Sequence, residues 1–355
     1  MFLSAVSLLL LGKAGAFDLN EREIKAWKKI QPSIVYLTDG SSISGTATLI
    51  DKEGLFLADR SAFTGTKAEG RATDGHTVHF VLLATDDPTQ FVLLKAENWN
   101  TSDGTPVSLA ETDSQQQRQP IPLIAITTNG PVRAEKVGSS YGIVVPSRRF
   151  MPLSEIRLEN TQASLGGALL FNLDGQLVGA LNATLETPAG QSNFQARSVQ
   201  NQSVGGGAGF GTRGGSGAGG GGGRGDSAGS FEKLQNNQYG PGLMATAYTV
   251  GPRILQRVVD GFRSPSHEVL HPSIGIVCRN AIPMGALIDS VKPGSTADKA
   301  GLRKGDIITK MSNQSVQNQF DFARIMLDQE VGTNLRMWVQ HENGLIQMID
   351  VPVGK

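Results

Sequence analysis

The most specific string in this chain of 355 residues is Gly294-Ser-Thr-Ala-Asp-Lys-Ala-Gly-Leu-Arg-Lys-Gly-Asp-Ile-Ile-Thr309. Its first glycine predicts a turn, and the alanines that follow predict one turn of helix. Gly301 can end that helix in the left-handed conformation. Gly305-Asp306 predicts a second tight turn, which leads into a strand at Ile307-Ile308. The string therefore predicts a small module of short strands and helices in the C-terminal quarter of the chain.

This string resembles the PDZ family, and the resemblance extends from about His271 to Val353. Upstream of the string, Ser273-Ile274-Gly275-Ile276 matches the family's carboxylate-binding loop, in which a glycine lets backbone N–H groups turn toward a peptide's terminal carboxylate. Downstream, Asn318 predicts the cap of a helix from Gln319 to about Leu327. The resemblance implies that a peptide adds as a strand between the second strand and this helix, with Ile274, Gly275 and Ile276 holding its C-terminus.

The same helix is expected to form an apolar pocket for the last side chain of the peptide. Phe322 and Met326 are four residues apart and therefore share a face, so they are the candidates. The alternative is that both side chains point into the module's own core and leave the groove to Ile325 or Ala323. The sequence does not decide between these two arrangements.

Upstream of the module, the pattern is typical of β-structure. Asn20 and Glu23 form a capping box that predicts a helix over residues 21–30. Short apolar runs then predict strands separated by turn dipeptides, and such spacing is typical of a barrel or sandwich. The expected strands are 33–37, 46–50, 55–58, 79–83, 91–94, 123–126, 168–172, 176–180 and 245–250, with a closing helix over 252–262.

A β-rich body followed by a PDZ module resembles the HtrA family of trypsin-like serine proteases. Four strings carry the resemblance, which covers about residues 21–262: Ile30–Val35, Gly45–Leu57, Gly166–Gly179 and Thr246–Pro252. It implies a mainly β fold, with a trypsin-like double β-barrel before the PDZ domain. It also implies three catalytic positions, a histidine, an aspartate and a serine, whose side chains must touch for hydrolysis to occur.

All three of these positions carry other residues. Ser61 stands where the family has its histidine, within Ala58-Asp59-Arg60-Ser61-Ala62. Gln90 stands in the place of the aspartate, and Leu165 in the place of the nucleophile. The expectation is therefore a catalytically degenerate homologue with no catalytic residues at these positions.

The alternative is an active serine endopeptidase of the HtrA family with a relocated triad, since triads are recognised by geometry. Ser164 adjoins the nucleophile position. The chain's five histidines are expected to be ordinary surface or core residues: His76, His79, His267, His271 and His341. They lack zinc-site spacing, and Cys278 has no cysteine partner, so no metal or other cofactor is expected.

The expected boundaries follow from composition. Residues 1–16 combine an apolar run with Ala14-Gly15-Ala16 and predict a signal peptide, hence export to the periplasm or secretion. Residues 17–262 form the protease-like domain, which contains a glycine-rich loop at 204–230 that is expected to be disordered. In residues 205–229, 15 of 25 are glycine, too much backbone entropy to order alone. Residues 263–270 are a linker and 271–355 the PDZ domain.

The charge balance limits the partners. The 32 basic and 32 acidic residues cancel, so nucleic acid and anionic lipid are not expected ligands. The expected partners are peptides or protein C-termini, unfolded proteins, or an active protease relative. The protein is expected to act on them as scaffold, holdase or regulator, with a structural adaptor in an envelope assembly as a further alternative. Many HtrA proteins trimerise, so the resemblance leaves a homo-oligomer open.

Overall fold

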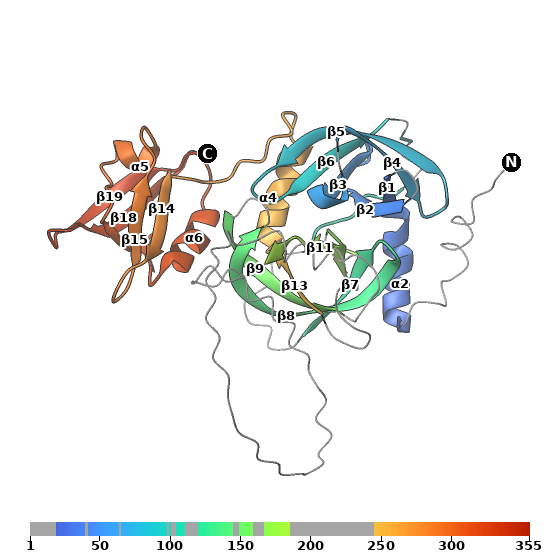
Figure 1. Ribbon diagram of the computed structural model, residues 1–355, viewed down its shortest axis with the longest axis horizontal. Helices are drawn as coiled ribbons and strands as arrows, with labels where there is room; N and C mark the ends of the chain where they lie inside the picture. Colours follow the sequence, from blue (N-terminus) through green and yellow to red (C-terminus); the bar gives the residue numbers. More distant parts are fainter. Residues whose placement is uncertain are drawn as a thin grey trace, which may run out of the picture.

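The computed structural model describes residues 19–39, 42–63, 65–97, 99–100, 104–110, 120–144, 149–158, 167–184 and 245–355. The expected signal peptide, the glycine-rich loop and Leu165 lie outside these ranges. Figure 1 shows two β-bodies side by side and a third, smaller body next to them. No helix among the described residues is long and apolar enough to cross a membrane.

The first described element is the helix α2 (Glu21–Ile30), and its capping box is confirmed. The Asn20 side chain accepts hydrogen bonds from backbone N–H groups of the first turn, and Glu23 Oε2 accepts one from the Asn20 N–H at 2.7 Å. Ala26, Trp27 and Ile30 are buried because their spacing puts them on one face of the helix. The helix therefore packs its apolar face against the core that the first β-body shares with the second.

That first body is a closed six-stranded barrel with the strand order β1-β2-β3-β6-β5-β4. Its strands are β1 (Ile34–Asp39), β2 (Ser42–Leu49), β3 (Leu55–Asp59), β4 (Lys67–Ala72), β5 (Thr77–Asp86) and β6 (Phe91–Ala96). Short 3-10 turns, η1 (Gln31–Ser33) and η2 (Arg60–Ala62), precede β1 and follow β3. The strand β4 was not predicted, because its sequence, KAEGRA, has no apolar alternation.

The second body is a seven-stranded sheet in the order β11-β10-β7-β8-β12-β13-β9, curled so that β8 also pairs with β9. Its strands are β7 (Ile121–Thr127), β8 (Gly130–Val144), β9 (Arg149–Leu158), β10 (Leu169–Asn172), β11 (Leu177–Ala180), β12 (Ala183–Thr184) and β13 (Ala245–Val250). Helix α4 (Pro252–Arg263) follows β13 and packs Ile254, Leu255, Val258 and Val259 into the core shared by both bodies. The trypsin-like fold expected from the sequence is confirmed, as a barrel and a half-barrel.

The third body is the PDZ domain. Its sheet has the order β14-β15-β16-β18-β19, with β17 paired to β16. The strands are β14 (Ile276–Asn280), β15 (Ala286–Val291), β16 (Ile307–Met311), β17 (Gln314–Ser315), β18 (Asn334–Gln340) and β19 (Ile346–Pro352); the helices are α5 (Thr296–Lys299) and α6 (Gln319–Leu327). This body has its own apolar core, and α4 runs along the side of the β-bodies that faces it (Figure 1).

Candidate functional site

The expected peptide groove lies between the strand β14 and the helix α6, which are neighbours in Figure 1. β14 is the edge strand of its sheet and pairs only with β15 among the described strands. The N-terminal end of α6 is fastened to the end of β14, because the Gln319 N–H donates to Asn280 Oδ1 at 3.1 Å. The free edge of β14 is therefore a template for one more strand.

The loop before β14 has the backbone geometry that a carboxylate-binding loop needs. Gly275 has φ +81°, a conformation that side chains with a Cβ rarely adopt. A Cβ on Gly275 would also lie 2.4 Å from Ser295 Cβ. The Gly275 N–H donates to Ser273 Oγ at 3.2 Å, and the Gly275 carbonyl accepts from the Lys292 N–H at 2.8 Å. A carboxylate that bound the Gly275 N–H would displace the 3.2 Å hydrogen bond to Ser273 Oγ.

The two isoleucines that flank Gly275 point their side chains inward. Ile274 is buried in the core of the module, and its carbonyl accepts a hydrogen bond from the Ala297 N–H at 3.0 Å. Ile276 is partly buried against the same core. With the side chains fixed in this way, the backbone of the loop is the part that faces a ligand.

The helix wall of the groove places the four candidate side chains at different depths. Ile325 is fully buried in the core, and Met326 almost fully. Phe322 and Ala323 keep some exposed surface, and Phe322 packs against that core. Phe322 therefore lies at the boundary between core and groove, while Ile325 belongs to the core. The assignment of Phe322 and Met326 to the ligand pocket stays a prediction.

Cys278 lies on the same strand β14 and packs against the core of the module. Burial raises the pKa of its thiol to about 12, so the sulfur stays protonated at neutral pH. A protonated thiol is a poor nucleophile and a poor metal ligand. Cys278 therefore acts as a small apolar side chain under the groove.

Where the two β-bodies meet, Ser61 is part of a hydrogen-bonded cluster around the buried Asp59. Asp59 caps the turn η2, and its Oδ1 accepts from the Ser61 N–H at 2.9 Å and from Ser61 Oγ at 2.5 Å. Asn182, which follows β11 in the second body, donates from Nδ2 to Asp59 Oδ2 and to the Thr89 carbonyl, both at 2.9 Å. This cluster joins the two β-bodies and uses both oxygens of the Asp59 carboxylate.

The electrostatics of the cluster are those of a buried carboxylate. Burial raises the pKa of the Asp59 carboxyl, and the hydrogen bonds from Ser61 and Asn182 act in the opposite direction. Among the described residues, the hydrogen-bond partners of the Asp59 carboxyl are Ser61 and Asn182, and no imidazole is one of them. In this part of the chain, Asp59 therefore has no titratable partner that could carry a proton to and from Ser61.

Gln90 occupies a position close to this cluster without joining it. Its backbone has φ +61°, and its side-chain Nε2 donates to the Asp87 carbonyl at 2.5 Å. The Gln90 carbonyl accepts from the Arg60 N–H at 2.8 Å. Within the described residues, no hydrogen bond joins the side chains of Gln90 and Ser61. Gln90 therefore holds its own turn and does not orient a residue at position 61.

Gly167, two residues after Leu165 in the sequence, lies next to the same cluster. Leu165 and Ser164 lie outside the described residues, but Gly167 is described and has φ +75°. A Cβ on Gly167 would lie 2.9 Å from Ser61 Oγ and 3.0 Å from Asp59 Cβ. The structure thus places Gly167 close to Ser61, and the assignment of Ser61, Gln90 and Leu165 to the catalytic positions stays a prediction.

The five histidines of the chain do not contact the Ser61 cluster in the described residues. His76 contacts the exposed Asp74 at 2.6 Å, and His341 Nδ1 contacts Asp306 Oδ1 at 2.8 Å. Throughout the described part of the chain, no imidazole makes a hydrogen bond to a serine hydroxyl. Across those same residues, no group of three or more His, Cys, Asp or Glu side chains is arranged to hold a metal ion.

Comparisons with known proteins agree with this geometry. The family model for the PDZ domain matches residues 287–340. The solved structure of the HtrA-type protease AlgW with a decapeptide superposes with a TM-score of 0.60 at 13% identity, covering 93% of this chain and 97% of that one. The serine endoprotease from Yersinia pestis superposes with a TM-score of 0.56 at 14% identity, covering 95% and 98%. The fold is that of the HtrA proteases.

Two curated HtrA-like relatives are similar in sequence. A probable periplasmic serine endoprotease DegP-like from Marinomonas is 23% identical over 79% of this chain and 51% of its own length. The serine protease PepD from Mycobacterium tuberculosis is 23% identical over 92% of this chain and 65% of its own length. This HtrA-like chain therefore spans about half to two thirds of the relatives that it matches.

One feature of the HtrA-like body was not found from the sequence. His271 Nε2 contacts Asp86 Oδ1 at 2.8 Å, and both side chains are buried. Asp86 also accepts a hydrogen bond from Thr89 Oγ1, one residue before Gln90. The pair connects the beginning of the PDZ domain to the end of β5, 185 residues away in sequence. No spacing rule signals such a contact, and His271 had been expected to lie outside the barrel as an ordinary histidine.

A second contact joins the PDZ domain to the HtrA-like body at α6. Arg257 on α4 donates from Nη2 to the carbonyls of Leu327 and Gln329, at 2.7 and 3.1 Å. The Leu327 side chain belongs to the core of the two β-bodies and not to that of its own domain. The helix that forms one wall of the groove is thus anchored on the protease-like body.

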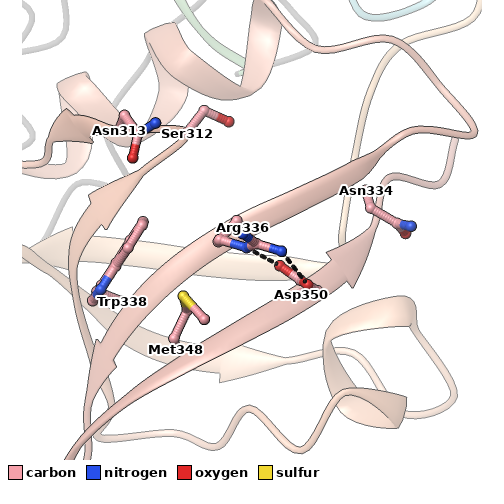
Figure 2. Close-up of a pocket in the computed structure, with 7 residues that line it drawn as sticks. All are labelled: Ser312, Asn313, Asn334, Arg336, Trp338, Met348 and Asp350. Carbon is pink, nitrogen blue, oxygen red and sulfur yellow. Dashed lines mark hydrogen bonds and ion pairs between the residues drawn. The ribbon is translucent and has the colours of Figure 1, made fainter.

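A hollow of about 460 Å³ lies on the outer face of the PDZ sheet (Figure 2). Trp338 and Met348 lie opposite one another on β18 and β19. The charged side chains of this hollow, Arg336 and Asp350, pair with each other through two contacts of 2.8 and 3.0 Å. Because this pair is neutral and lies on the face away from α6, the hollow lacks the features of the carboxylate site. It is lined by Ser312, Asn313, Asn334, Arg336, Trp338, Met348 and Asp350.

Proposed function

We propose that this protein is an exported HtrA-family pseudoprotease whose PDZ domain binds peptides or unfolded polypeptides by their free C-termini. It would act as a scaffold, a holdase or a regulator of an active relative. The observation that carries the proposal is the free edge of β14 beginning at a loop in which Gly275 has φ +81°. Such an edge offers main-chain hydrogen bonds, and the loop offers N–H groups to a carboxylate.

Three other observations support parts of this proposal. The AlgW structure is that of a complex with a decapeptide, and one relative is described as periplasmic, in line with the leader at residues 1–16. Ser61 at the histidine position is held in the cluster with Asp59 and Asn182. A serine hydroxyl cannot serve as a general base near neutral pH. The boundaries proposed from the sequence are 17–262 for the protease-like domain, 263–270 for the linker and 271–355 for the PDZ domain.

Peptide binding is tested by titrating the full chain with a peptide that ends in an apolar residue, followed by fluorescence anisotropy. We expect micromolar affinity, about −8 kcal/mol. Amidation of the terminus should weaken binding about tenfold or more, because charge-assisted hydrogen bonds contribute roughly 1.5–3 kcal/mol. Equal binding of the acid and the amide would mean that the loop is not a carboxylate site.

Catalytic silence is tested with a serine-directed phosphonate and an unfolded protein substrate. We expect neither labelling nor turnover above background. Leu165→Ser should stay inactive, since restoring one triad member without its base restores almost no rate. Stoichiometric labelling of Ser164 in the unmodified chain would replace the pseudoprotease by an endopeptidase with a relocated triad.

A further inference from the structure

The hairpin that joins β14 to β15 carries the most exposed large apolar side chain of the described residues. Ile282 at its tip is 94% exposed, and Met284 is 52% exposed. Apolar side chains scattered singly on a surface need no explanation, but these two lie two residues apart on one hairpin.

The position of the hairpin tip is fixed by hydrogen bonds at its base. The Ala281 N–H donates to the Gly285 carbonyl at 2.9 Å, and the Gly285 N–H donates to the Gln317 carbonyl at 2.8 Å. Gln317 lies just before α6, whose Gln319 N–H is bonded to Asn280. The tip therefore lies past the N-terminal end of α6, at the end of the groove opposite Gly275.

The direction of a bound peptide follows from where its carboxylate is held. A terminus at Ile274–Ile276 requires the rest of the peptide to extend along β14 toward Asn280, and hence to run antiparallel to this strand. Paired strands advance by about the same 3.4 Å per residue. The five residues of β14 thus accommodate roughly the last five residues of the peptide. The preceding residues must pass over the hairpin at 281–285.

We infer that Ile282 and Met284 form an extension of the groove that selects apolar side chains about six to eight residues before the peptide's C-terminus. This inference rests on the proposed peptide binding. Extended segments present side chains to alternate faces, so one or two apolar residues in this stretch can reach the tip. The unbranched Met284 can adjust its shape to different partners.

Two other occupants fit the hairpin less well. Two side chains are far fewer than the roughly 20–30 residues that each partner contributes to a stable protein interface, so a second copy of the chain could not be held here alone. A membrane surface is attracted by unpaired basic residues, whereas Arg279 on β14 contacts Asp289 at 3.5 Å. A continuing peptide requires only a narrow contact that follows the strand edge.

The test compares three peptides that share the same five C-terminal residues. One is a pentamer, one is a decamer with apolar residues at positions six to eight from the C-terminus, and one is a decamer with serines there. Anisotropy titrations of the full chain should give an affinity for the apolar decamer about tenfold higher than for the pentamer, as expected for one or two newly buried side chains. The serine decamer should bind like the pentamer.

The protein variants separate the hairpin from the groove. In the double variant Ile282→Ser, Met284→Ser, the apolar decamer should lose its advantage while the affinity for the pentamer stays unchanged, which also shows that the domain is folded. Leu345→Ser is the matched control, because Leu345 is 59% exposed on the hairpin between β18 and β19. In this control variant, the apolar decamer should keep its full affinity advantage over the pentamer.

The outcomes are distinct. Equal binding of the two decamers, or an advantage that survives in the double variant, would overturn the hairpin extension while the pentamer still supports the proposed function. Absence of binding by all three peptides would remove the proposed function and this inference together.

Discussion

At the scale of single residues, the proposed peptide binding depends on the backbone conformation of Gly275. Two independent features exclude a larger residue there: its φ of +81° and the 2.4 Å approach to Ser295 Cβ. The first costs stability wherever it occurs, about 1–3 kcal/mol for a side chain held in a sparsely populated region. The second distorts only this loop. A control that shares the first feature alone can separate them.

We therefore predict that Gly275→Val weakens peptide binding tenfold or more, whereas Gly344→Val leaves it unchanged. Gly344 has φ +82° and no atom within 4 Å of where its Cβ would lie, so it carries the backbone strain without the clash. Both variants should lose about 1–3 kcal/mol of stability from that strain. Urea unfolding and anisotropy titration on the same samples measure the two effects. An equal loss of affinity in both variants would contradict the carboxylate-loop assignment.

His341 makes the stability of the PDZ domain depend on pH. The hydrogen bonds to Asp306 and then to Gln347 raise the pKa of the His341 imidazole. Because the folded-state pKa lies above the unfolded value of about 6.5, protonation favours the folded state. This contribution is fully present below about pH 6.5 and is lost as the pH rises through the higher folded-state pKa.

The expected result is that, as the pH rises above about 6.5, the melting temperature of the unmodified protein falls more steeply than that of His341→Gln. Other histidines also titrate in this range, so the difference between the two curves carries the result. Calorimetric melting at half-unit intervals of pH measures it. Parallel curves would show that the contact with Asp306 leaves the His341 pKa where it is in the unfolded chain.

At the scale of secondary-structure elements, the sequence was most informative where a local signal ends an element. The helices over 21–30 and 319–327 were predicted with their observed bounds, because capping residues mark the N-terminus of each. Strand 245–250 was also predicted with its observed bounds. β8, by contrast, was not predicted over its 15 residues. It is held by pairing with β7 and β9, and pairing between distant strands leaves no local pattern.

In the candidate site, too, residues next to a recognisable string could be assigned from the sequence, and a residue without one could not. Ser61 and Gln90 were assigned to the expected histidine and aspartate positions from the strings that border them, and this assignment stays a prediction; the structure places Ser61 beside Gly167. The partner that completes the Asp59 cluster, Asn182, could not be predicted. It comes from the other β-body, 123 residues away, and a single asparagine has no sequence signature. Only the packing of two complete β-bodies brings it into contact.

This cluster should stabilise the contact between the two β-bodies. Asn182→Ala removes the donor to Asp59 Oδ2 and leaves a buried acceptor unsatisfied, which costs about 1–3 kcal/mol. Combining it with Asp59→Asn should cost less than the sum of the single changes, because the two residues share one interaction. Urea unfolding of the four proteins gives the coupling energy. Strict additivity would indicate that the two side chains stabilise the fold independently.

At the scale of the whole molecule, the helix α6 at the proposed groove is in direct contact with the protease-like body. The last turn of any helix leaves carbonyls without intrahelical partners. In α6, the Leu327 carbonyl and that of Gln329 just beyond it are held by Arg257 from α4, and the Leu327 side chain is buried in the core of the β-bodies. The helix that forms one wall of the proposed peptide groove is therefore ordered partly by another domain.

Arg257→Met should loosen this wall, and Arg253→Met on the same helix should not. The methionine keeps apolar contact but removes the donors to both carbonyls, so the last turn of α6 should fray and its amide hydrogens should exchange faster. Arg253 pairs with Asp328 at the surface, where such pairs contribute about 0–1 kcal/mol.

Peptide affinity should fall a few-fold in Arg257→Met, because the frayed helix must be ordered again on binding. Hydrogen exchange over residues 322–330, read with and without a bound peptide, measures both effects. If Arg257→Met left exchange and affinity as they are in the unmodified chain, α6 would be ordered by its own domain alone, and the PDZ groove would act independently of the body to which it is attached.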